Sequence, residues 1–220
     1  MDDSNEFDRR GFLGFTAAAA AAALGLAAAA PSARAATGPS TPFTQWLDSI
    51  PGTHKVTLDV REPGGGMCNA WAWVYLFTAP KAYGMSEGDM GVAMVLRHNA
   101  IPFALGDAAW SKYKLGEVFK IDDHKTGQAA VRHPFYVDMP ADFLPDMALQ
   151  KLIERGVKPI ACDMAVFHYS GVVAKAMGLK HEDVMADWNA DFLPGVAHAP
   201  SGVVACQGLG ERGASYIYAG

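Results

Sequence analysis

Short apolar or β-branched runs alternate with helical stretches along most of this chain, and that order constrains its fold more than any other feature. Five runs are expected to be strands, at residues 54–60, 90–96, 157–162, 194–199 and 214–219. The segments between them are long enough for crossover helices, so successive strands are expected to run parallel. Right-handed crossovers then place helices on both faces. We predict an α/β domain, a three-layer sandwich with a mainly parallel five-stranded sheet.

Helices are expected over residues 43–50, 68–82, 102–113, 144–155, 165–177, 184–192 and 202–211. Gly84, Gly156 and Gly178 follow three of these segments, where a glycine commonly ends a helix. Ser201 precedes the last segment and is suited to its N-cap. Pro159 lies inside the third predicted strand and has no N–H to donate to a ladder. An edge position or a bulge is therefore expected there.

The stretch 114–142 interrupts the pattern. It mixes glycines and prolines with charged residues and shows no clear periodicity. A loop of this length inside a compact domain is uncommon and is often functional. We therefore expect an insertion that serves function or assembly.

The first 35 residues have the composition of an export signal. Arg9 and Arg10 are followed by Phe12 and Leu13, then by an alanine-rich run and small residues up to Ala35. A charged start, a modest apolar run and a small-residue cleavage site define such leaders. The arginine pair resembles a twin-arginine signal; an ordinary secretory signal and an uncleaved anchor are the alternatives. We predict recognition by the export machinery, cleavage after Ala35 and a periplasmic location.

The rest of the chain has the size of one ordinary domain. We divide the chain into the leader at 1–35, a linker and short N-terminal segment at 36–55, and an α/β domain at 56–220. The formal net charge is −5 and no basic run occurs, which argues against a nucleic-acid partner. The alanine-rich run is too weakly apolar for a stable membrane span, which needs roughly 20 apolar residues.

Three cysteines, Cys68, Cys162 and Cys206, follow the leader. An odd number leaves at least one thiol without an intramolecular partner. Cys206 lies in a helical pattern and is expected in the core. The cysteine spacings fit no zinc motif, and no phosphate loop, HExxH or GxSxG motif occurs. Hydrolase and nucleotide-binding functions thus find no support, and no cofactor or metal is expected.

Cys162 is the leading candidate for chemistry. It ends the third predicted strand and precedes a helix, so its sulfur would lie near free backbone N–H groups at the positive end of the helix dipole. Both favour the nucleophilic thiolate. Asp163 opposes this with its own negative charge, or serves instead as the helix cap. His168, on the same helix, could approach the thiol. The alternative is that Cys162 is a small buried core residue.

Arg97 and His98 directly follow the second predicted strand, at the edge where ligands gather in parallel sheets. Arg97 could bind an anion and His98 could relay a proton. Alternatively, Arg97 pairs with an acid of the 114–142 segment, and His98 packs with a backbone hydrogen bond. Cys68 opens a helix beside a glycine turn. If that turn lies beside the third strand, Cys68 and Cys162 can act as attacking and resolving thiols, or form a disulfide.

Three stretches resemble the DsrE-like family of sulfur-relay proteins. They are residues 156–165 (GVKPIACDMA), the ending 213–220 (GASYIYAG) and residues 97–105 (RHNAIPFAL), and the order of elements is similar as well. Residues 97–105 resemble the exported branch of the family. The resemblance covers roughly residues 56–220. It implies a DsrE-like fold, a homo-oligomer such as a trimer or hexamer, and a cysteine that carries persulfide sulfur to a partner thiol. Cys162 aligns with that cysteine. Pro159, Asp163, the 114–142 insertion and the export signal depart from the usual family pattern.

These observations lead to one functional hypothesis and two alternatives. We expect an exported persulfide carrier or thiol-redox protein in which Cys162 accepts sulfur, with Arg97, His98, Cys68 and Asp163 as binding residues around it. Any catalytic step would be sulfur transfer, with a thiol or sulfane-sulfur partner protein. The alternatives are a non-catalytic module that binds a small anion or metal, and a structural oligomer subunit.

Overall fold

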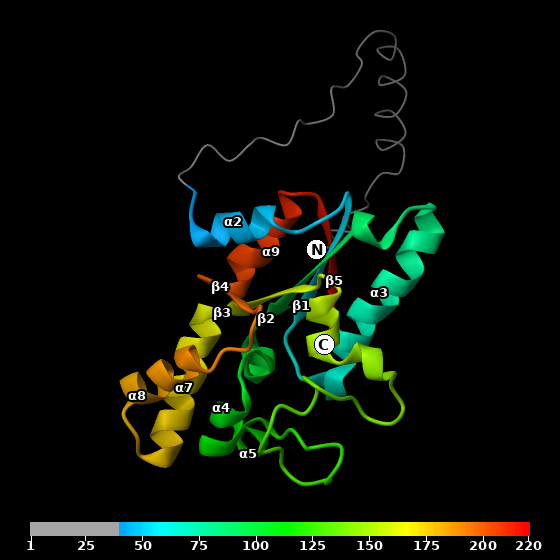
Figure 1. Ribbon diagram of the computed structural model, residues 1–220. Coiled ribbons are helices and arrows are strands. Elements are labelled where there is room, and N and C mark those ends of the chain that lie inside the picture. The colour runs from blue at the N-terminus through cyan, green and yellow to red at the C-terminus, as the bar shows by residue number, and fades with distance from the viewer. Residues whose placement is uncertain (1–39) are drawn as a thin grey trace, which may run out of the picture. The chain divides into compact units, whose positions relative to one another are not determined.

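The computed structural model describes residues 40–220, so the signal residues Arg9, Arg10, Phe12 and Leu13 and the cleavage position Ala35 lie outside the described residues. Five strands form one parallel sheet in the order β4-β3-β2-β1-β5 (Figure 1). They are β1 (His54–Val60), β2 (Met90–Leu96), β3 (Lys158–Cys162), β4 (Ala197–Ala199) and β5 (Ala214–Tyr218). The predicted α/β class and the five-stranded parallel sheet are confirmed.

Eight α-helices surround the sheet within residues 40–220. They are α2 (Pro42–Asp48), α3 (Met67–Tyr83), α4 (Asp107–Lys112), α5 (Leu115–Phe119), α6 (Leu149–Glu154), α7 (Asp163–Met177), α8 (His181–Ala190) and α9 (Gly202–Gly210). Gly84 and Gly178 cap α3 and α7 in the left-handed conformation, as the sequence predicts. The Ser201 hydroxyl accepts a hydrogen bond from the N–H of Val204 at 3.2 Å and so begins α9.

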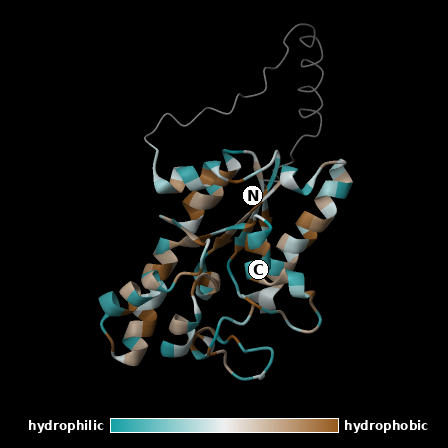
Figure 2. Cartoon of the chain, in the orientation of Figure 1, coloured by the Kyte–Doolittle hydropathy of each residue, from teal (hydrophilic) through white to brown (hydrophobic). Residues whose placement is uncertain are grey.

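The sheet lies between two helical layers. In β2, Val92, Met94 and Leu96 belong to the larger core, which includes residues of α3, α6 and α7. Ala93 and Val95 belong to the smaller core with residues of α2 and α9 on the other face. Figure 2 shows hydrophobic residues along the strands, and hydrophobic and polar residues alternating on the helices. The architecture is thus a three-layer sandwich. Helix α2, within the segment predicted to be a linker and short N-terminal element, contributes to this core.

The helix predicted over residues 102–113 is shorter in the structure. Residues His98–Ala104 form a 3-10 helix, and α4 begins only at Asp107. The N–H of Gly106 donates to the carbonyl of Asp191, and the carboxylate of Asp191 accepts from the N–H of Ala109, both at 2.7 Å. Asp191, far away in sequence, therefore decides where α4 begins.

The helix predicted over residues 144–155 is also divided. Pro145–Met147 form a 3-10 turn, Ala148 is extended, and α6 starts at Leu149. The N–H of Leu149 donates to the carbonyl of Phe135 at 3.0 Å. This contact with the 114–142 segment replaces the intrahelical bond that a longer helix would make at that position.

Pro159 does not lie in a bulge and β3 is not an edge strand, but at Pro159 itself the strand has a neighbour on one side only, so the expected edge position is found locally. Strand β3 lies between β2 and β4, and its register with β2 continues unbroken through Pro159 and its partner Met94. The ladder between β3 and β4 starts one residue later, at Ile160 and Ala197. Because β4 is so short, Pro159 lies beyond its reach, and an internal strand tolerates a proline there.

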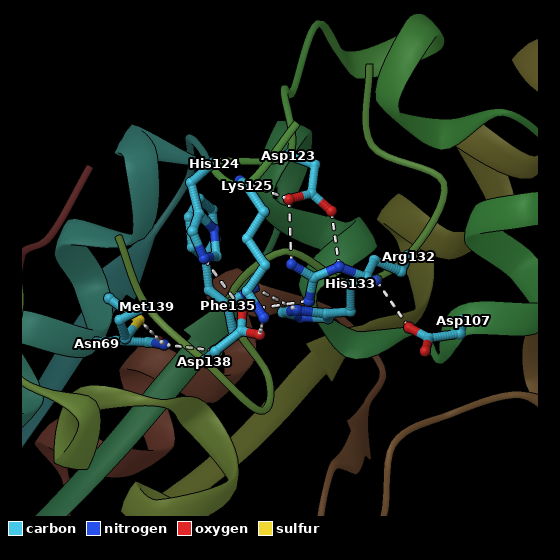
Figure 3. Close-up of polar contacts among 10 residues, drawn as sticks. All are labelled: Asn69, Asp107, Asp123, His124, Lys125, Arg132, His133, Phe135, Asp138 and Met139. Atoms are coloured by element: carbon cyan, nitrogen blue, oxygen red, sulfur yellow. Dashed lines mark hydrogen bonds and ion pairs between the residues drawn. The ribbon is translucent and has the colours of Figure 1, made fainter. Parts of the chain in front are cut away.

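The 114–142 segment contains α5 and an isolated antiparallel bridge between Asp122 and Ala129, and contributes no strand to the sheet. Arg132 holds it together through two hydrogen bonds to Asp123, at 2.6 and 3.0 Å, and one to Asp138 at 3.2 Å (Figure 3). His133 of the same segment is buried in the core. Over residues 40–220, no helix combines the length and the apolar character needed to cross a membrane.

Candidate functional site

A cavity of about 390 Å³ lies at the carboxyl ends of β2, β3 and β4. Its walls are formed by Arg97, His98, Cys162, Met164, Ala165, His168, Tyr169, Ser201, Gly202 and Val203. The structure therefore brings three predicted site residues, Arg97, His98 and Cys162, to one cavity. His168 lines it as well. These residues meet because the carboxyl ends of neighbouring parallel strands lie at the same edge of the sheet.

Cys162 ends β3 and is the N-cap residue of α7. It is 7% exposed and lines the cavity, so its thiol is recessed but opens onto a cavity. The side chain makes no capping hydrogen bond, which means that the expected N–H contact to the sulfur is not formed. What acts on the sulfur is the dipole of a 15-residue helix that begins at the next residue.

Asp163 is the first residue of α7 and does not cap it, contrary to one of the two roles predicted for it. Its Oδ1 lies 2.8 Å from Nδ1 of His198, and both side chains are partly exposed. Asp163 does not line the cavity. Its carboxylate is paired with His198 on β4, so the structure does not place Asp163 among the residues that line the cavity.

Arg97 is held by a carboxylate that the sequence analysis did not single out. Its Nε and Nη2 donate to Oδ1 and Oδ2 of Asp59 on β1, at 2.6 and 2.7 Å. The hydroxyl of Tyr216 on β5 also donates to Oδ2 of Asp59, at 2.6 Å. Burial acts to raise the pKa of Asp59, which is 0% exposed, but the hydrogen bonds from Arg97 and Tyr216 and the charge of Arg97 outweigh it and lower this pKa.

The pairing between Arg97 and Asp59 replaces both predicted roles of the arginine. Its partner comes from the neighbouring strand β1 and not from the 114–142 segment. The guanidinium donates from Nε and Nη2 to Asp59 and from Nη1 to His98. Arg97 is therefore a fixed part of the cavity wall and not a free anion ligand. An acidic residue inside a buried strand is itself unusual, and that signal could have identified Asp59 from the sequence.

His98 adopts a left-handed backbone conformation, with φ of 50°. This conformation is uncommon outside glycine, and it occurs here directly beside the cavity. Nε2 of His98 lies 2.8 Å from Nη1 of Arg97. Because an arginine N–H can only donate, Nε2 is the acceptor and the proton of the neutral ring is assigned to Nδ1. Burial and the charge of Arg97 lower the pKa of His98, which keeps the ring neutral.

Gly202 was also missed, and it shapes the site by being small. A Cβ atom at this position would lie 2.6 Å from Cδ and 3.1 Å from Cβ of Arg97. The start of α9 can approach the arginine only because residue 202 has no side chain. Together, Asp59 on one side and Gly202 on the other fix the position of Arg97.

Cys68 does not join the site. It lies in α3, is buried, donates from Sγ to Oδ1 of Asn69 at 3.6 Å, and forms no disulfide. Burial raises its pKa to about 12. The glycine turn before it, Gly64–Gly66, contributes to a second cavity of about 470 Å³ and not to the cavity of Cys162. The predicted meeting of Cys68 and Cys162 as a thiol pair is therefore not found. Cys206 is half-buried, and burial together with the charge of Asp59 raises its pKa to about 11.

No model of a known protein family matches this chain, and no curated protein matches it either. Within residues 40–220, no group of three or more His, Cys, Asp or Glu side chains is arranged to hold a metal ion. The fold and the cavity define the class: an α/β protein with a recessed thiol at the carboxyl edge of a parallel sheet. The function is therefore argued from the cavity itself.

Proposed function

We propose that this chain is an exported, DsrE-like sulfur carrier in which Cys162 holds sulfane sulfur as a persulfide. The observation that carries the proposal is the placement of the thiols. Of the three cysteines, all within the described residues, Cys162 lines the cavity, whereas Cys68 and Cys206 do not. The raised pKa values of Cys68 and Cys206 keep those two sulfurs protonated and unreactive at neutral pH.

The surroundings of Cys162 suit a thiolate nucleophile. The positive end of the α7 dipole stabilises a negative charge on the sulfur and on the persulfide that forms there. Arg97 adds a fixed cation to the wall, and neutral His98 has no proton on Nε2 to give to the sulfur. The proposal includes a partner thiol that later removes the sulfur, and assembly as a homo-oligomer.

A small-anion binding module is the main alternative, with Arg97 as the anion ligand. The structure favours the carrier over this alternative because the guanidinium already satisfies Asp59 in a two-point contact. Binding of sulfate or phosphate that survives Cys162→Ser but is lost in Arg97→Ala would support the module instead.

The carrier function is tested by intact-protein mass spectrometry after incubation with a sulfane-sulfur donor. The wild type is expected to gain about 32 Da per sulfur, the increment of persulfidation. Cys162→Ser should gain nothing, while Cys206→Ser, the matched control, should gain as much as the wild type. An unmodified wild type, or equal gain in Cys162→Ser, would contradict the proposal.

The periplasmic location has its own test. Replacing Arg9 and Arg10 together by lysine retains the charge but removes the arginine pair that twin-arginine export recognises. The doubly substituted chain is expected to stay in the cytoplasm at full length, while the wild type is recovered from the periplasm without its leader. Equal export of both chains would contradict the twin-arginine assignment and leave an ordinary secretory signal.

A further inference from the structure

We propose that the donor accepted at the Cys162 cavity is a small organic persulfide with an apolar body, and not an inorganic polysulfide or a cysteine on the surface of a folded protein. This inference rests on the proposed function and specifies its substrate class. Three properties of the cavity support it: its size, the chemistry of its walls and the depth of the thiol.

The size of the cavity indicates an organic donor. Its volume of about 390 Å³ falls in the range of about 300–1,000 Å³ that is typical of small-molecule sites. A chain of two or three sulfur atoms would occupy a small part of this space and leave the walls in contact with water. A donor with several carbon atoms would fill it.

The walls favour an apolar donor. Met164 and Val203, at the starts of α7 and α9, line the cavity and are 61% and 69% exposed. An apolar ligand that covers such exposed side chains removes their apolar surface from water, which favours binding. Among the described lining residues, Arg97 carries the fixed charge, and its N–H groups are already hydrogen-bonded to Asp59 and His98. A donor with carboxylates would therefore find no uncommitted arginine or lysine on these walls.

The depth of the thiol favours a small donor over a protein. Cys162 is 7% exposed and lines the cavity. A new disulfide-type bond requires two sulfur atoms at about 2.05 Å. Because so little of this side chain is exposed, a cysteine on a rigid convex surface has poor access to the thiol, whereas a small persulfide can enter the cavity.

The transfer step balances without an added oxidant or reductant. The Cys162 thiolate attacks the outer sulfur of R–S–S–H and forms a new S–S bond. The S–S bond of the donor breaks, and its electron pair leaves on the inner sulfur as R–S⁻, which takes a proton from water. The outer sulfur retains its own proton until Cys162–S–S–H ionises.

The test compares donors and wall variants. The rate at which Cys162 gains sulfur is measured by intact-protein mass spectrometry with three donors: butyl persulfide, glutathione persulfide and inorganic polysulfide. Each rate is divided by the rate at which the same donor reacts with free cysteine, which corrects for the intrinsic reactivity of the donor. Butyl persulfide is expected to load about tenfold faster than either other donor, the discrimination that a small apolar contact supplies. Val203→Asn should remove most of this preference. Val204→Asn is the matched control, because Val204 is the next residue of α9, is also exposed and does not line the cavity.

The outcomes separate this inference from the function on which it rests. If no donor modifies the wild type at Cys162, the carrier function itself is refuted. If inorganic polysulfide or glutathione persulfide loads as fast as butyl persulfide, the carrier stands and the donor class is overturned. The donor class is also overturned if Val203→Asn and Val204→Asn behave alike. Thermal unfolding of both variants verifies that they are folded.

Discussion

Acidification should destabilise this protein through one buried histidine, His133. This side chain belongs to the 114–142 segment (Figure 3) and is 2% exposed. It contacts the 3-10 helix that starts at His98. Its Nε2 lies 3.1 Å from the carbonyl of Phe103, and its Nδ1 accepts from the N–H of Phe135 at 3.1 Å. A second proton would break the bond to Phe135 and leave a buried cation. Burial accordingly lowers the pKa of His133 from 6.5 to about 4.

The sign and the size of the effect follow from this shift. Between about pH 6.5 and pH 4 the unfolded chain binds a proton at His133 that the folded protein does not, so stability falls as the pH falls through this window. Each pH unit in the window changes the free energy of unfolding by about 1.4 kcal/mol. The difference between pKa values of 6.5 and about 4 therefore corresponds to about 3 kcal/mol, lost between neutral pH and pH 4.

Urea unfolding monitored by tryptophan fluorescence, repeated between about pH 7 and pH 4.5, measures this dependence. The decisive variant is His133→Gln, which has an amide in place of the ring and cannot titrate. Its free energy of unfolding should be lower than that of the wild type at neutral pH and should fall less steeply as the pH falls across the window. His98→Asn is the control, because His98 also has a lowered pKa and asparagine tolerates its left-handed backbone. The reasoning is refuted if His133→Gln retains the slope of the wild type, or if His98→Asn alone removes it.

Two further predictions concern the support of Arg97. Asp59→Asn leaves a largely buried guanidinium without its ionic partner and should lower the free energy of unfolding by about 3 kcal/mol. It should also slow persulfide loading of the folded fraction. Unchanged loading would show that Arg97 needs no fixed position. Gly202→Ala forces a Cβ to within 2.6 Å of Cδ of Arg97 and should destabilise the protein by about 1–3 kcal/mol. Gly210→Ala, with open space around its Cβ position, should be neutral, and equal Tm values for the two glycine variants would contradict the close approach of α9.

Much of the fold follows from local patterns. The strands at His54–Val60 and Met90–Leu96 have the predicted bounds. Partial alternation of apolar and polar residues indicates the first, and a continuous apolar run indicates the second. The left-handed glycines after α3 and α7 were likewise predictable from chain chemistry. The two divided helices were not, because acceptors distant in sequence, Asp191 and Phe135, decide where α4 and α6 begin.

The candidate site was predicted in part, for a similar reason. Arg97, His98 and Cys162 each follow a strand, and parallel strands bring their carboxyl ends together, so the sequence determined that these residues would lie at one edge of the sheet. The lateral order of the strands was decided by tertiary structure alone. That order places Asp59 of β1 beside Arg97 and leaves Cys68 outside the cavity. Side-chain partners across a sheet depend on which strands become neighbours, and local periodicity within each strand does not encode that choice.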